Sequence, residues 1–185
     1  MRIIAGQRRG LVLSQFDAEF IRPTKDIVKE FIYNCLANLK DISACAVCDL
    51  YAGTGSLGIE ALSRGCVSAT FVETDARAAK LIKKNIDLTG LKTSAVVIQE
   101  DAIRFLKDSK EIFDIILADP PYDLRNGNEI IRSVLNFRRL NPGGALILES
   151  SPKDKINAFE EYPELALYKQ KKWGETLVTI LTKNV

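Results

Sequence analysis

Hydrophobic and polar residues follow two different periods along this chain. From residue 44 onward, short apolar runs that suit buried strands alternate with segments whose apolar residues recur every three or four positions, which is typical of amphipathic helices. Strands joined through helices in this way require right-handed crossovers, so the pattern predicts a doubly wound, mostly parallel α/β sheet with helices on both faces. We expect strands at 44–50, 68–73, 93–99, 113–118 and 143–149, and helices beginning near Ser56 and spanning 75–88, 101–107 and 127–138, with a short helical piece from about 152.

Both ends of the chain depart from this alternation. Residues 165–183 contain two β-rich runs around "KWGE", which predicts an antiparallel C-terminal hairpin. Near the start, "RIIAG" and "LVLSQ" flank "QRRG", so we expect residues 1–23 to form a short basic β-hairpin. The segment 24–39 has helical spacing, with Thr24 as its expected N-cap. The sequence therefore predicts one domain, 1–185, built on a seven-stranded sheet, with 1–23 as a hairpin extension.

Composition and charge add two expectations. The 185 residues are 46% hydrophobic and 27% charged, which suits one soluble domain with a sizeable core. No apolar run approaches the roughly 20 residues that span a bilayer, and the first residues lack the pattern of a signal peptide, so we expect a cytoplasmic protein. The net charge is only +2, but basic residues are concentrated in the first 25 positions. These residues could form a basic face or an ordinary solvated surface, and the charge pattern favours neither interpretation.

Cysteine and histidine usage limits the chemistry. Cys45 and Cys48 form a C-x-x-C, but they lie in an expected strand, and the chain has neither a second ligand pair nor any histidine. We therefore expect Cys35, Cys45, Cys48 and Cys66 to be reduced thiols, with the C-x-x-C packed in the core, and we expect no metal site. The missing histidine also excludes Ser-His and Cys-His nucleophilic pairs.

A glycine-rich loop follows the strand at 44–50. Gly53-x-Gly55-x-x-Gly58 stands between a strand and a helix, where glycines let the backbone approach a ligand and the helix N-terminus offers free N–H groups. Glu73 ends the next strand, where a carboxylate can accept both hydroxyl protons of a ribose. The combination indicates a nucleoside-bearing cofactor, either a nicotinamide dinucleotide or S-adenosylmethionine.

Acidic residues at the strand ends favour the second of these cofactors. Asp49, Glu73, Asp101 and Asp119 would all lie at the carboxyl edge of the sheet, where ligands bind. Four carboxylates suit the sulfonium and ammonium groups of S-adenosylmethionine better than an anionic pyrophosphate. We assign the first three to binding, although Asp49 or Asp101 alone could be a helix cap or a loop acid. Asp101 could also accept a hydrogen bond from the adenine amine.

The strand at 113–118 ends in Asp119-Pro120-Pro121-Tyr122. Each proline fixes φ and lacks an N–H, so the turn is stiff and no local donor competes for its acceptors. Asp119 and the Pro120 carbonyl can then accept the two protons of an exocyclic NH2 group, while Tyr122 stacks on the base. This arrangement predicts methylation of a nucleobase amine, whereas a plain strand-to-loop turn is the alternative for the tetrapeptide in isolation.

Taken together, these motifs resemble those of a known family. "DLYAGTGSLGIEALSRG", "FVETD" and "ADPPY" are similar to motifs of class I S-adenosylmethionine-dependent methyltransferases of the D/N-P-P-Y type, which have a Rossmann-like fold. "RIIAGQRRG" and "RPTKDIVKEFIYNCL" resemble the bacterial 16S rRNA guanine-N2 methyltransferase (RsmD-like) family. The resemblance implies methyl transfer to guanine 966 of 16S rRNA, in the small ribosomal subunit or a late assembly intermediate. We also expect a monomer that contacts no membrane.

The resemblance also implies a role for each matching residue. The catalytic turn is formed by Asp119, Pro120, Pro121 and Tyr122. The pocket for S-adenosylmethionine is lined by Asp49, Ala52, Gly53, Gly55, Glu73, Thr74, Asp101 and Ala102. The nucleic-acid contacts are Arg8, Arg9, Arg22, Pro23, Thr24 and Lys25.

Three other functions stay open at this point. A DNA or RNA adenine-N6 methyltransferase would share the D-P-P-Y turn, although no insertion long enough to read DNA sequence interrupts the alternation of strands and helices. An NAD-dependent oxidoreductase would share the glycine loop, but it needs a hydride-handling acid or base, often histidine. A non-catalytic RNA-binding module would leave the crevice dispensable.

Overall fold

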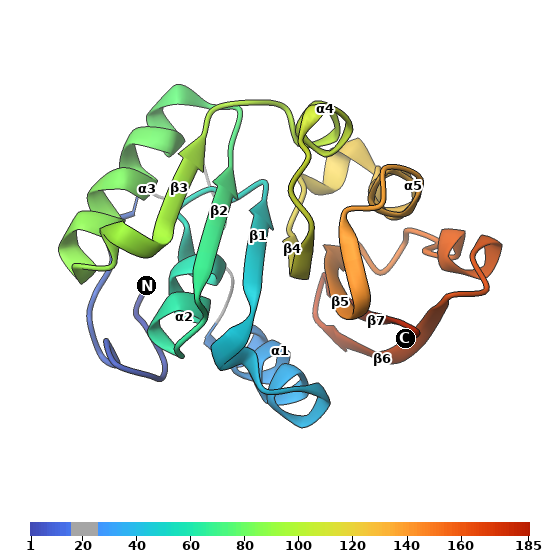
Figure 1. Ribbon diagram of the computed structural model, residues 1–185, viewed down its shortest axis with the longest axis horizontal. Helices are drawn as coiled ribbons and strands as arrows, with labels where there is room; N and C mark the ends of the chain where they lie inside the picture. The colour runs from blue at the N-terminus through green and yellow to red at the C-terminus, as the bar shows by residue number, and fades with distance from the viewer. Residues whose placement is uncertain (16–25) are drawn as a thin grey trace.

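One seven-stranded sheet forms the centre of the molecule (Figure 1). The computed structural model describes residues 1–15 and 26–185, the side chain of Tyr122 excepted. The strand order is β3-β2-β1-β4-β5-β7-β6. The strands are β1 Ala46–Leu50, β2 Ser68–Val72, β3 Ala95–Ile98, β4 Phe113–Ala118, β5 Leu140–Ser150, β6 Leu165–Trp173 and β7 Thr176–Lys183.

The strand directions confirm the predicted sheet and its C-terminal hairpin. Strands β1 to β5 are parallel, and β7 pairs antiparallel with both β5 and β6. The antiparallel strand therefore lies one position inside the sheet, and β6 forms the edge. Because β6 is antiparallel to β7, it runs in the same direction as the parallel strands.

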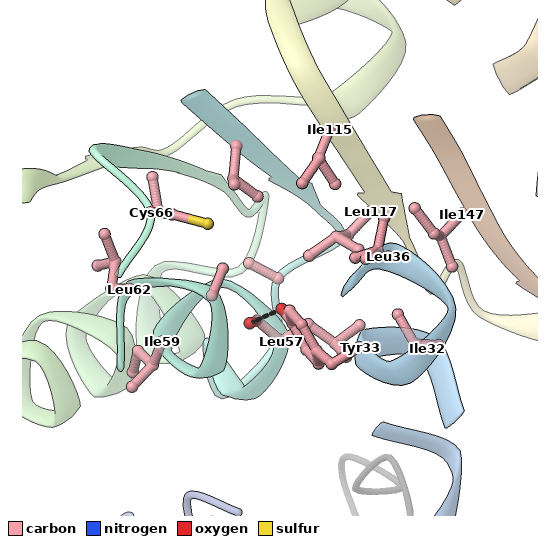
Figure 2. Close-up of a cluster of buried hydrophobic side chains, with 14 of the residues drawn as sticks. Ile32, Tyr33, Leu36, Leu57, Ile59, Leu62, Cys66, Ile115, Leu117 and Ile147 are labelled. Atoms are coloured by element: carbon pink, nitrogen blue, oxygen red, sulfur yellow. Dashed lines mark hydrogen bonds between the residues drawn. The ribbon is translucent and has the colours of Figure 1, made fainter. Parts of the chain in front are cut away.

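Helices cover both faces of the sheet, as the alternating pattern predicts. They are α1 Asp26–Leu39, α2 Ser56–Ser63, α3 Ala76–Thr89, α4 Ala102–Asp108 and α5 Gly127–Asn136. Side chains alternate along β4, so that Ile115 and Leu117 pack with α1 and α2, whereas Ile116 packs with α4 and α5. Figure 2 shows the first of these clusters, in which Tyr33 of α1 donates a hydrogen bond from its hydroxyl to the Leu57 carbonyl of α2 at 2.6 Å.

Two of the helices, α3 and α4, begin at an aspartate whose side chain accepts hydrogen bonds from their first N–H groups. The Asp75 carboxylate accepts hydrogen bonds from the N–H groups of Arg77 and Ala78 and so caps α3. The prediction of a Thr24 cap for α1 lies outside the described residues. No helix in residues 1–15 and 26–185 is long and apolar enough to cross a membrane.

The four cysteines are free and buried, which confirms the prediction of reduced thiols and of a core position for the C-x-x-C pair. Cys48 is fully buried within β1, and burial raises the pKa of its thiol well above the ordinary value. Burial likewise raises the pKa of Cys66 to about 12. Such thiols stay protonated at neutral pH and are poor ligands and nucleophiles.

The predicted helical piece from about 152 is wrong. Residues 152–154 form a turn, and the next helical segment is a 3-10 helix, η4, at Ala158–Glu161. Within the turn, the Ser151 carbonyl accepts the N–H of Asp154 and the Ser151 hydroxyl accepts the N–H of Lys153. These local bonds offer the backbone an alternative to a helix.

The predicted N-terminal hairpin forms only in part. Its two arms meet in one isolated antiparallel bridge, between Arg2 and Val12, rather than in two strands. The reason is that the first arm and the turn bond to α2: the N–H groups of Ile4 and Ala5 donate to Glu60, and those of Gln7 and Arg8 donate to the carbonyl and hydroxyl oxygens of Ser63. Gly6 has a φ of +84°, and a Cβ there would lie 1.9 Å from the Ser63 carbonyl oxygen, so this close approach requires glycine.

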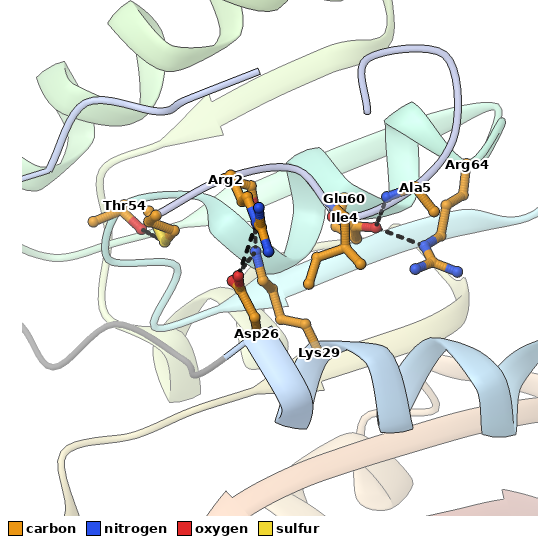
Figure 3. A network of polar contacts seen from close by, with 9 residues as sticks. Arg2, Ile4, Ala5, Asp26, Lys29, Thr54, Glu60 and Arg64 are labelled. Carbon is orange, nitrogen blue, oxygen red and sulfur yellow. Dashed lines mark hydrogen bonds and ion pairs between the residues drawn. The ribbon is translucent and has the colours of Figure 1, made fainter. Parts of the chain in front are cut away.

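A buried carboxylate fastens this N-terminal segment to α2 (Figure 3). Glu60 is fully buried, and its two oxygens accept the N–H groups of Ile4 at 2.8 Å and Ala5 at 3.0 Å. The same carboxylate accepts the Nε–H of Arg64 at 2.7 Å. Lys29 is equally buried and donates from Nζ to the Arg2 carbonyl at 2.7 Å. Residues 1–15 are therefore an integral part of the fold.

Candidate active site

The carboxyl ends of β1, β2 and β4 bring acidic side chains to one edge of the sheet. Asp49 of β1 is 2% exposed, and its Oδ2 accepts the N–H of Gly58 at 2.8 Å. Burial raises the pKa of Asp49 to about 8; the Gly58 hydrogen bond opposes this rise, and the charges of Asp119 and Glu73 add to it. The structure thus brings these three carboxylates near one another, and the raised pKa favours the protonated form of Asp49.

The glycine loop turns tightly above these acids. Gly53 and Gly55 have φ values of 57° and 78°, in the left-handed region that favours glycine. The N–H of Gly53 donates to Oε2 of Glu73 at 2.8 Å, and the N–H of Asp75 donates to Oε1 at 2.9 Å. Each carboxylate oxygen can accept more than one hydrogen bond, so Glu73 keeps acceptor capacity for the hydroxyl groups of a ribose. Ala52, also in this loop, is buried.

The third glycine of the motif serves packing. A Cβ on Gly58 would lie 2.4 Å from a ring carbon of Phe71 and 3.1 Å from Oδ2 of Asp49. Glycine therefore lets α2 lie close against β2 while its N–H reaches the buried carboxylate, which is the packing role expected of the last glycine in such a loop.

Asp101 occupies a different environment from Asp49. It is exposed and caps α4, with Oδ1 accepting the N–H of Arg104 at 2.9 Å. The helix-cap alternative is therefore realised, and the exposed carboxylate retains capacity for a further hydrogen bond. Its neighbour Ala102 is buried, and Thr74, after β2, is exposed.

The D-P-P-Y turn follows β4 directly. Asp119 is half-buried, Pro120 is buried and Pro121 is exposed. The Pro121 carbonyl accepts the N–H of Leu124 at 3.0 Å and so closes the short 3-10 helix Tyr122–Leu124. Among the backbone hydrogen bonds of the described residues in this turn, none uses the Pro120 carbonyl, the second acceptor that the sequence predicts for a substrate amine.

Two further residues connect the glycine loop to the segment after the turn. The hydroxyl of Tyr51 accepts a hydrogen bond from Nδ2 of Asn126 at 2.8 Å, across 75 residues of sequence. Tyr51 has a φ of 57°, and burial raises its pKa to about 12. The sequence analysis did not predict this pair. No pattern in the nearby sequence indicates a tyrosine in the left-handed conformation or a contact between residues 75 positions apart.

The predicted nucleic-acid residues that the structure describes lie far from the D-P-P-Y turn. Arg8 donates from Nε to the Thr89 carbonyl, at the C-terminal end of α3, and Arg9 is exposed. Because α2 and α3 run back from the carboxyl edge, their C-terminal ends lie at the opposite edge of the sheet from Asp119 (Figure 1). The other predicted contacts, Arg22, Pro23, Thr24 and Lys25, lie outside the described residues.

Comparisons with known proteins cover nearly the whole chain. The profile of a family described as conserved hypothetical protein 95 matches residues 1–182. Ribosomal RNA small subunit methyltransferase D of Haemophilus influenzae is 39% identical over 158 residues, which are 84% of this chain and 80% of that protein. YlbH of Bacillus subtilis is 32% identical over 186 residues, which are 99% of each chain.

Solved structures show the same fold. The structure of yhhF from Escherichia coli has a TM-score of 0.86 at 29% sequence identity, over 100% of this chain and 98% of that chain. A hypothetical protein of Thermus thermophilus has a TM-score of 0.81 at 27% identity, over 100% of this chain and 99% of that chain. The similarity therefore extends over the sheet, its helices and the C-terminal hairpin.

Proposed function

Since the chain belongs to the family described as conserved hypothetical protein 95 and is a methyltransferase, we propose that it methylates the exocyclic N2 of a guanine in 16S rRNA, with S-adenosylmethionine as methyl donor. The proposed base is guanine 966. The observation that carries the proposal is the meeting of the glycine loop, the acids Asp49 and Glu73 and the D-P-P-Y turn at one sheet edge. The proposed substrate is the small ribosomal subunit or a late assembly intermediate, and the enzyme acts as a cytoplasmic monomer.

The residues of the loop fit S-adenosylmethionine. Left-handed Gly53 and Gly55 allow a close approach of the backbone, and Glu73 has acceptor capacity for ribose hydroxyls. The buried Asp49, with its raised pKa, would be stabilised in its ionised form by a nearby positive group. When bound, S-adenosylmethionine supplies a methyl group attached to a sulfonium. The remaining pocket residues are Ala52, Thr74, Asp101 and Ala102.

Asp119 carries the chemistry on the protein side. An exocyclic amine is a poor nucleophile because its lone pair is delocalised into the ring, and it becomes positively charged as it reacts. The Asp119 carboxylate and the Pro120 carbonyl each accept a hydrogen bond from the amine, which orients the nitrogen. As the N–C bond forms and the bond from the methyl group to sulfur breaks, Asp119 takes up the one proton that the nitrogen loses, while the other hydrogen stays on the methylated amine. Proton acceptance of this kind typically contributes about 10²–10⁴-fold to the rate. Pro121 keeps the turn stiff, and Tyr122 stacks on the base.

The experiment that tests this function replaces Asp119. Asp119→Ala should reduce methyl transfer to unmodified small subunits below detection, while calorimetry shows unchanged cofactor affinity. Asp119→Asn is the matched control, since it keeps a hydrogen-bond acceptor but cannot take up a proton, and we expect only residual turnover. Full turnover by either variant would contradict the role of Asp119.

The identity of the base needs a separate measurement. Labelled methyl groups, mapped by mass spectrometry after incubation with unmodified subunits, should appear on N2 of a single guanine. A label on N6 of an adenine would instead support the adenine-N6 alternative, which uses the same D-P-P-Y turn.

A further inference from the structure

The edge strand β6 carries a concentration of positive charge that the proposed site does not use. Its sequence, LALYKQKKW, has three lysines and no acidic residue, and every position from Ala166 to Lys172 is exposed. Leu167 and Tyr168 are 46% and 41% exposed. Within the described chain, β6 pairs with β7 alone, so its outer edge faces outward.

The strand register places these lysines level with the carboxyl ends of the parallel strands, where the D-P-P-Y turn lies. Ala118 of β4 aligns with Leu148 of β5, then with Thr179 of β7 and Gln170 of β6. Lys171 therefore lies in the next row, where Asp119 follows Ala118. Adjacent strands are about 4.8 Å apart, so three steps separate the two positions by about 15 Å. A few nucleotides flanking a base held at Asp119 can cover that distance.

Two aromatic rings order the lysine side chains. Phe31 of α1 and Trp173 meet edge to face, with ring centroids 4.6 Å apart. The ammonium of Lys171 lies 4.8 Å from the centroid of Trp173 and 5.3 Å from that of Phe31, and the ammonium of Lys169 lies 5.7 Å from Phe31. Contacts between a cation and a ring hold these flexible side chains in place, so that less entropy is lost when they bind an anion.

We propose that Lys169 and Lys171, ordered by Phe31 and Trp173, bind the phosphates of the RNA that flanks the target nucleotide. The inference rests on the proposed RNA substrate. RNA phosphates fit this surface because they are negatively charged, whereas the strand carries only positive charge at the edge of the sheet where the base must enter. Arg8, by contrast, already donates to a helix end at the opposite edge of the sheet.

Protection of an exposed sheet edge is the competing explanation for these lysines. Charged side chains on an edge strand discourage pairing with another chain. Charge reversal separates the two explanations, because glutamate also protects an edge but repels phosphate.

The test compares two double variants that lower the net charge equally. Lys169→Glu with Lys171→Glu reverses the proposed contacts. Lys107→Glu with Lys110→Glu is the matched control, since both are exposed, one in the last turn of α4 and one before β4, at the opposite edge of the sheet. We expect the first variant to raise KM for unmodified small subunits by about tenfold and to weaken the salt dependence of binding by about one phosphate contact per lysine. Its kcat and its cofactor affinity should stay at wild-type values.

A cross-linking experiment identifies what the strand contacts. A photoreactive benzoylphenylalanine in place of the exposed Lys172 should cross-link to 16S rRNA close to the methylated nucleotide. Cross-links to a ribosomal protein alone, or equal KM values for the two double variants, would overturn the inference. Failure of the proposed function would look different: the wild-type protein itself would methylate no ribosomal substrate. The inference about Lys169 and Lys171 is judged only by comparing the variants with an active wild type.

Discussion

Two buried carboxylates at helix α2 are in contrasting situations: Glu60 belongs to the helix, and Asp49 lies in β1 against Gly58 of the helix. Glu60 accepts three hydrogen bonds, from two backbone N–H groups and from Arg64, and it fastens residues 1–15 to the fold. Asp49 accepts the N–H of Gly58 and lies near two other acids, and its pKa rises to about 8. Both are almost fully buried. The comparison teaches that burial alone does not identify a functional acid, whereas burial beside like charges makes Asp49 a candidate for one.

Replacing Glu60 should give the largest change in the free energy of unfolding. Glu60→Ala should lower the free energy of unfolding by about 3–5 kcal/mol, because it leaves two backbone N–H groups and the nearby cations Arg64 and Lys29 without their shared anion. Urea denaturation measures the loss. Glu60→Gln, which keeps a carbonyl acceptor, should lose less, and equal stability of wild type and Glu60→Ala would show that the carboxylate does not fasten the segment.

Asp49 should have the next largest effect on the free energy of unfolding, and this effect depends on pH. Its folded-state pKa of about 8 lies above the ordinary value near 4, so between these limits the native protein holds a proton that the unfolded chain has lost. The contribution of Asp49 to the free energy of unfolding is therefore fully present below about pH 4. It is lost as the pH rises through about 8, by up to about 1.4 kcal/mol per pH unit. Unfolding should be measured at several pH values between 5 and 8.

Asp49→Asn is the control for that measurement. The asparagine side-chain carbonyl can still accept the Gly58 N–H but does not titrate, so the difference between the two stability curves isolates Asp49. We expect the wild-type curve to fall relative to the variant as the pH rises. Parallel curves would mean that Asp49 is ionised throughout, and the contrast with Glu60 would disappear.

A smaller effect is expected at the link between the cofactor loop and the substrate side. Tyr51→Phe removes the acceptor of the Asn126 amide and should lower stability by about 1 kcal/mol. If the link also positions the turn, kcat should fall while cofactor affinity, measured by calorimetry, stays the same. Unchanged kcat would limit the pair to a structural role.

The smallest expected effect separates the two arginines of the N-terminal turn. Arg8→Ala removes a cation from the C-terminal end of α3 and should cost about 0.3–1 kcal/mol in thermal unfolding. Arg9→Ala, at an exposed position, should leave stability unchanged. The sequence-based prediction that both arginines contact RNA is tested on the double variant, whose binding to subunits should weaken with a smaller salt slope. An unchanged salt slope would count against that contact.

Much of the fold could be predicted from the sequence because its signals are local. Strand β4 and the helices after β2 and β3 follow from apolar spacing and from the capping residues Asp75 and Asp101. The parallel topology then brings Asp49, Glu73 and Asp119 to one edge without any knowledge of their contacts. The position of β7 between β5 and β6 has no local signal, because a hairpin can add to a sheet by either strand.

The rest depends on contacts between distant segments. Glu60 reads as one polar residue in an apolar helix, and nothing near it in the sequence indicates that its partners are the N–H groups of Ile4 and Ala5. Likewise, the sequence predicts from charge that Arg8 and Arg9 contact nucleic acid, but it does not indicate that Arg8 donates a hydrogen bond to the Thr89 carbonyl at the end of α3. Charge identifies a candidate surface, but only the tertiary structure shows at which edge of the sheet it lies.

The attachment of residues 1–15 also bears on the order of folding. Ala5 bonds to a residue 55 positions later, Ser14 to one 71 positions later and Arg8 to one 81 positions later. Closing loops of this length costs chain entropy before any contact rewards it. We therefore expect residues 1–15 to be among the last parts of the chain to dock, and to be the first to detach in native-state hydrogen exchange. A nascent chain would hold α2 with its Glu60 carboxylate still open to water until then.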